Sequence, residues 1–71
     1  MNIVLQSKGS SDFIEDLGGA WTKEREHAHV FANGLEAFVF CFKRRLSNMQ
    51  MVATFLDPRM NFSIPVADVR A

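Results

Sequence analysis

A helix-capping motif stands directly before the most ambiguous run of this sequence. Residues 38–42 alternate Phe with Val and Cys, a composition that suits a strand as well as a helix. Asn33 and Glu36 precede the run at the spacing of a capping box, in which the Asn33 side chain accepts a hydrogen bond from the Glu36 amide and the Glu36 carboxylate accepts one from the Asn33 amide. Because only a helix start leaves these donors unpaired, the motif predicts a helix.

The predicted helix covers about residues 34–47 and carries an apolar stripe. At about 100° per residue, one side of it gathers Leu35, Phe38, Val39, Phe42, Leu46 and Met49. We expect this stripe to face the core. Lys43, Arg44 and Arg45 lie near the end, where positive charge complements the exposed carbonyl groups, and Asn48 is the expected left-handed residue that ends the helix.

Strand-forming residues flank the helix on both sides. Residues 3–5 and 13–15 are predicted to form a first hairpin across a Ser- and Gly-rich loop. Residues 50–56 and 62–64 are predicted to form a second hairpin, across a turn rich in Asp, Pro and Asn. Pro65 cannot donate to a ladder, so it either ends the last strand or places it at a sheet edge.

The segment between the first hairpin and the helix contains two breaks. Gly18 and Gly19 predict a turn, after which Thr22 is positioned to cap a short helical turn over residues 23–26. Residues 29–31 fit strand and coil equally well, and both interpretations stay open.

These elements predict an α+β fold of ββαββ order, with a mainly antiparallel sheet of about four strands and one long helix (about residues 34–47) on one face. Residues 1–71 are expected to form a single small domain. One helix cannot cover both sides of a sheet. The other side is therefore expected to face water, to carry a ligand or to pack on a second subunit.

The composition of the chain argues against several classes of protein, including nucleic-acid-binding, membrane-spanning and secreted proteins. The 71 residues carry no net charge, so no global field attracts nucleic acid or an anionic membrane. No run reaches the roughly 20 apolar residues of a membrane span, and residues 1–6 lack the features of a signal peptide. The single cysteine, Cys41, cannot form an internal disulfide. We expect a cytoplasmic protein without membrane contact that relies on tight packing or oligomerisation for stability.

Phe40 is the anomalous residue of the predicted helix, because it lies about 140° from the apolar stripe. Two explanations stay open. Either a terminal segment or the loop around Trp21 folds over Phe40, or Phe40 is exposed in the lone subunit and contacts a partner.

Lys43 and Arg44 belong to the densest basic cluster, which with Phe40 could contact phosphates and stack on a base. The helix dipole alone also explains basic residues at this helix end.

Other candidate residues have simpler explanations. His27 and His29, with Glu24 or Glu26, could contribute to a metal site, but no further ligands complete it, and surface histidines are the favoured interpretation. Cys41 borders the apolar stripe, so packing is favoured over nucleophilic chemistry. We predict no catalytic, cofactor-binding or metal-binding residues and no cofactor.

The central third of the chain resembles a pattern found in short uncharacterised bacterial and phage-borne proteins. The resemblance rests on the spacing of Trp21, Thr22, Ala28, Phe31, Glu36 and Ala37. It implies a hairpin that leads through a Trp-Thr turn into a helix. It implies no catalytic or binding residues and no activity.

The leading hypothesis is a non-catalytic protein-interaction module that self-associates, most simply as a homodimer, through the uncovered sheet face and Phe40. A different protein partner would use the same surface. The alternative is a nucleic-acid-binding accessory protein that uses Lys43, Arg44 and exposed aromatic side chains. A third hypothesis, an enzyme or ligand-carrying domain with its site at a dimer interface, lacks a visible set of catalytic residues.

Overall fold

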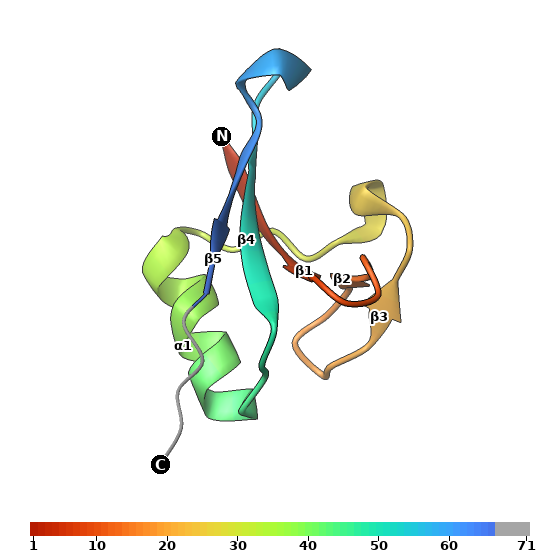
Figure 1. Cartoon of the computed structure of the whole chain (residues 1–71), viewed down its shortest axis with the longest axis vertical. Helices are drawn as coiled ribbons and strands as arrows, with labels where there is room; N and C mark the ends of the chain where they lie inside the picture. The colour runs from red at the N-terminus through yellow and green to blue at the C-terminus, as the bar shows by residue number, and fades with distance from the viewer. Residues whose placement is uncertain (67–71) are drawn as a thin grey trace.

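The computed structural model describes residues 1–66, which form a five-stranded antiparallel sheet with one α-helix against it (Figure 1). The elements are β1 (Asn2–Ser7), β2 (Phe13–Ile14), β3 (Trp21–Thr22), α1 (Gly34–Arg44), β4 (Met49–Thr54) and β5 (Phe62–Pro65). The strand order is β3-β2-β1-β4-β5. The predicted α+β fold and both predicted hairpins are confirmed. Residues Trp21 and Thr22 add a fifth strand that the sequence did not indicate.

The sheet is centred on β1 and β4, which come from opposite ends of the chain. Their antiparallel register pairs Ile3 with Ala53 and Leu5 with Met51. Side chains alternate between the two faces of a strand, so these four residues share one face of the sheet. Val4 lies on the other face.

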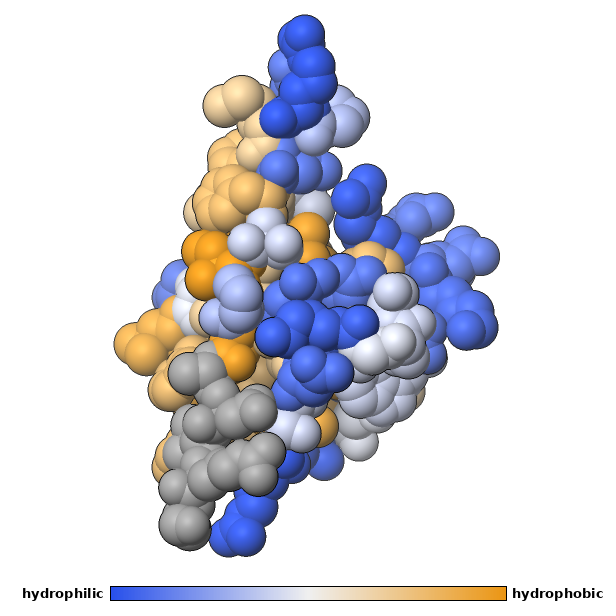
Figure 2. Space-filling model, in the orientation of Figure 1, coloured by the Kyte–Doolittle hydropathy of each residue, from blue (hydrophilic) through white to orange (hydrophobic). Residues whose placement is uncertain are grey.

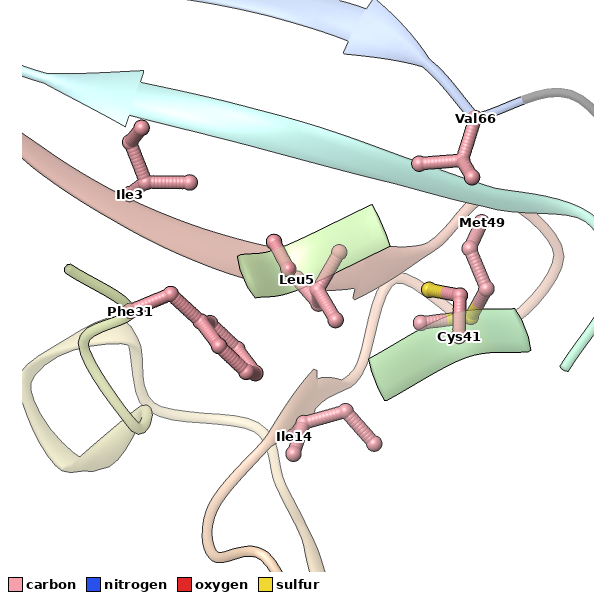
Figure 3. Packing of buried hydrophobic residues seen from close by; sticks show 8 residues of the cluster. Ile3, Leu5, Ile14, Phe31, Cys41, Met49 and Val66 are labelled. Carbon is pink, nitrogen blue, oxygen red and sulfur yellow. The ribbon is translucent and has the colours of Figure 1, made fainter. Parts of the chain in front are cut away.

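The main core lies between this face and α1 (Figure 3). Its buried members are Ile3, Leu5, Ile14, Phe31, Ala37, Cys41, Met49 and Val66. Helix α1 contributes two small side chains to the core, Ala37 and Cys41. Small residues at a contact allow a helix to lie close to its partner, which moves the larger side chains of α1 to its flanks.

The opposite face of the sheet is partly covered by the segment that follows β3. Ala28 packs there with Val4 and Phe13, and all three are buried. The same segment then runs beside β1, because the amide of Phe31 donates to the carbonyl of Ile3 at 2.8 Å. Phe31 thus forms an isolated bridge, which answers the question left open for residues 29–31.

The N-terminus of α1 matches its prediction and the C-terminus does not. Asn33 Oδ1 accepts a hydrogen bond from the Glu36 amide at 2.9 Å, which confirms one of the two hydrogen bonds of the predicted capping box, while the reciprocal bond to the Glu36 carboxylate stays a prediction. The helix ends at Arg44 rather than near residue 47, because Arg45 already adopts a left-handed conformation, with a φ of 54°. Asn48 is left-handed as predicted, with a φ of 58°, but it lies beyond the end of the helix. The amide of Leu46 donates back to the carbonyl of Cys41 at 3.0 Å, and Leu46 packs against the core.

The short helical turn before α1 lies further along the chain than predicted. It spans Arg25–His27, and Thr22 belongs to β3. The Thr22 hydroxyl accepts a hydrogen bond from the Glu24 amide at 3.1 Å, so it closes a local turn and does not cap a helix.

Within residues 1–66, no helix has the length and apolar composition needed to cross a membrane.

Candidate functional site

Only part of the predicted apolar stripe faces the core, where Met49 is buried and Phe38 and Leu46 pack against it. Leu35 is 72% exposed, Phe42 is 54% exposed and Val39 is 37% exposed. The helix is rotated so that Ala37 and Cys41 lie against the sheet instead. The stripe prediction is therefore wrong for these three large residues, which leave one flank of α1 apolar and open to solvent.

Strand β5 adds two more exposed apolar side chains on the same side of the sheet. Phe62 pairs with Ala53 and Ile64 pairs with Met51, so both lie on the face that carries α1. Phe62 is 49% exposed and Ile64 is 50% exposed. The start of α1 lies next to β4, because a Cβ atom at Gly34 would be 3.6 Å from the Met51 sulfur.

These five side chains form what we call the α1–β5 surface, made of Leu35, Val39, Phe42, Phe62 and Ile64. Figure 2 shows hydrophobic residues gathered along the side of the molecule where α1 and β5 lie. This surface was not predicted from the sequence, because Leu35, Val39 and Phe42 were expected to lie in the core. The available signal was the length of the apolar run, since residues 37–42 surround most of a helix and cannot all be buried by one sheet.

Phe40 lies on the opposite flank of α1 and is half-buried. Its ring centroid is 5.5 Å from that of Phe31, and it packs against the main core. The Arg44 guanidinium lies over the ring, and Arg44 Nη2 also donates a hydrogen bond to the Leu17 carbonyl. The expectation of a fully exposed Phe40 ring is wrong, but the ring is covered by Phe31 and Arg44 and not directly by the loop around Trp21.

A small cavity separates this loop from the helix. It has a volume of about 250 Å³ and is lined by Ile14, Gly18, Gly19, Trp21, Phe40, Arg44 and Leu46. Phe40 and Arg44 are thus brought together by the fold. Lys43 is exposed and lies about 60° away from Phe40 around the helix, on the side of Glu36.

A second cleft, of about 540 Å³, lies on the sheet face opposite α1. Its lining residues are Asn2, Val4, Arg25, Glu26, Ala28, Val30, Thr54, Phe55, Pro58 and Asn61. The side-chain amide oxygen of Asn61 accepts from the Phe55 amide at 2.7 Å, which fixes the adjoining hairpin. No nucleophile paired with a base is found among these lining residues.

The remaining candidates from the sequence are the two histidines and Cys41. His29 packs edge-on against Phe31, with ring centroids 4.8 Å apart, while His27 is exposed. Across residues 1–66, no three His, Cys, Asp or Glu side chains are grouped so that they could hold a metal ion. Cys41 is buried, and desolvation raises the pKa of its thiol.

No family model, curated protein or solved structure matches this chain. The resemblance to short bacterial and phage-borne proteins stays a prediction.

Proposed function

We propose that this protein is a non-catalytic interaction module that self-associates through the α1–β5 surface, with the homodimer as its functional unit. The observation that carries the proposal is the exposure of five large apolar side chains from two adjacent elements. Monomeric proteins tolerate scattered exposed hydrophobic residues, whereas apolar side chains gathered on one side of the molecule, as in Figure 2, support an interaction site.

The size of the α1–β5 surface fits a homodimer. With about 200 Å² for a whole large apolar side chain, the exposed fractions of the five residues correspond to roughly 500 Å². A standard interface buries about 800 Å² of each partner, and about 65% of a homodimer interface is apolar, which is roughly 520 Å². The surface therefore supplies the apolar part of one standard interface.

The charge of the chain does not oppose self-association. Eight Lys and Arg balance eight Asp and Glu, so two copies carry no net repulsion at neutral pH. Proteins near zero net charge associate more readily than strongly charged ones.

The nucleic-acid alternative depends on Phe40 stacking on a base, together with Lys43 and Arg44 at phosphates. The Phe40 ring instead contacts Phe31 and the Arg44 guanidinium. Self-association through α1 and β5 needs no rearrangement of these contacts, and we therefore prefer it.

The test is the solution mass, measured by size-exclusion chromatography with light scattering from low to high micromolar concentration. We expect the wild-type mass to approach twice the chain mass of 8.0 kDa as concentration rises. Phe42→Asp should remain a monomer while keeping the wild-type circular dichroism spectrum. Leu56→Asp is the matched control, because Leu56 is fully exposed outside the α1–β5 surface. A wild-type protein that stays monomeric at high micromolar concentration would reject the proposal.

A further inference from the structure

We infer that two copies of this chain pair through antiparallel α1 helices across a two-fold axis near Val39, and not by joining their sheets at β5. This inference rests on the proposed self-association and specifies its geometry. Its evidence is the hydrogen-bonding direction of β5, the spacing of apolar residues on α1 and the placement of Glu36 and Lys43.

The outer edge of β5 is a poor template for another strand. The Val66 amide donates to the Met49 carbonyl at 2.9 Å, so the amide of Val66 points toward β4. In an antiparallel ladder the direction alternates, and the amides of Ser63 and Pro65 therefore point away from β4. Proline has no N–H group, which leaves Ser63 as the one outward donor of β5 itself.

The other end of the sheet is no better suited to strand addition. β3 consists of Trp21 and Thr22 alone, and two residues give few ladder hydrogen bonds. Short edges and an edge proline are the usual devices by which sheets avoid pairing with other chains. Two copies are therefore expected to associate by packing their α1–β5 surfaces against each other.

The exposed flank of α1 has the spacing that a helix pair requires. Leu35, Val39 and Phe42 follow one another at intervals of four and three residues, as in the contact stripe of packed helices. A two-fold axis at Val39 places Leu35 of one copy beside Phe42 of the second copy, and Val39 beside its own equivalent.

The charges of Glu36 and Lys43 favour an antiparallel over a parallel arrangement of the two helices. Glu36 and Lys43 are seven residues apart, so they lie within about 20° of each other beside the apolar stripe. An axis near Val39 brings Glu36 of one copy to Lys43 of the other, twice per dimer. In a parallel two-fold pair, Glu36 and Lys43 of the two copies would lie on opposite sides of the interface and could not pair, and the two helix dipoles would be aligned unfavourably.

The experiment exchanges these two charges between variants. Glu36→Lys and Lys43→Glu, each alone, should bind itself about tenfold more weakly than wild type at low salt, because both interchain pairs become like-charged. An equimolar mixture of the two variants should recover near-wild-type affinity, since both interchain pairs of the mixed dimer then join a lysine of one variant to a glutamate of the other. Analytical ultracentrifugation with one labelled variant measures both affinities.

A control pair separates local pairing from net charge. Lys8→Glu and Glu15→Lys change the net charge by the same amounts at exposed sites outside α1, and we expect each to dimerise like wild type. If mixing the two α1 variants raises the dimer affinity no more than mixing the two control variants does, the antiparallel arrangement is overturned. A dimeric wild type would still leave the proposed function standing. A monomeric wild type overturns both.

Ser63→Pro gives an independent readout. It removes the outward N–H of β5 without touching the α1–β5 side chains, so the dimer affinity should stay within about twofold of wild type. Loss of the dimer in this variant, with its circular dichroism spectrum unchanged, would show strand pairing at β5 and would overturn the inference.

Discussion

The guanidinium of Arg44 lies over the ring of Phe40, with Cζ 5.6 Å from the ring centroid. Arg44 also donates to the Leu17 carbonyl, so one side chain ties the end of α1 to the loop between β2 and β3. A cation over an aromatic face is attracted by the ring quadrupole. The side of α1 that carries Phe40 is thereby held against the loop between β2 and β3, while Leu35, Val39 and Phe42 on the other side stay exposed.

Two phenylalanines on α1 should therefore respond differently to truncation. Phe40→Ala removes a ring that packs against Phe31 and the main core, and we expect a loss of about 2 kcal/mol in the free energy of unfolding. Phe42→Ala removes a half-exposed ring, and we expect a loss below about 1 kcal/mol. Urea unfolding of dilute protein measures both, and equal losses would show that the rotation of α1 is wrong.

The fold could be predicted wherever a local sequence pattern is compatible with only one type of secondary structure. Asn33 and Glu36 specified the start of α1, and strand-forming runs on either side of loops gave the two hairpins. Trp21 and Thr22 were not predicted as a strand, because a strand of two residues forms only when a neighbouring strand pairs with it. It is held by pairing with Phe13 and Ile14, which a sequence pattern does not display.

The orientation of α1 could not be obtained from its sequence. Apolar residues occupy positions 37–42 without interruption, so several rotations of the helix bury a similar amount of hydrophobic surface. The sheet selects the rotation that places Ala37 and Cys41 against Leu5 and Met49, because small residues permit close packing. The candidate surface follows from that selection, which is a tertiary effect.

Removal of the helix cap should destabilise the protein. Asn33 Oδ1 accepts from the Glu36 amide at 2.9 Å, and Asn33→Ala leaves that donor without its side-chain partner. We expect a loss of about 1 kcal/mol in the free energy of unfolding. Asn33→Ser should retain most of the stability, because a hydroxyl can accept the same hydrogen bond. Chemical denaturation compares the three proteins, and a serine variant as unstable as the alanine variant would argue against capping.

Two glycines should respond in opposite directions to substitution by alanine. Gly19 has a φ of 99°, which is strained for any residue with a Cβ atom, so Gly19→Ala should lower the free energy of unfolding by about 1–2 kcal/mol. Gly34 is helical and a Cβ there meets the Met51 sulfur at an ordinary 3.6 Å, so Gly34→Ala should raise stability by about 0.5 kcal/mol. Thermal unfolding at matched concentrations distinguishes the two, and a destabilised Gly34→Ala would show that the helix start is packed more tightly against β4.

Cys41 should make the stability of the protein fall at alkaline pH. Burial raises the pKa of its thiol above the usual range, so in the unfolded chain the thiol loses its proton at a lower pH than in the folded protein. The unfolded state then binds fewer protons, and the free energy of unfolding decreases as the pH rises above about 8.5. Urea titrations at pH 7 and pH 9.5 measure the change, and Cys41→Ala should lose less stability between the two. A thiol reagent should label native Cys41 slowly and the urea-unfolded protein rapidly; fast labelling of the native protein would place Cys41 outside the core.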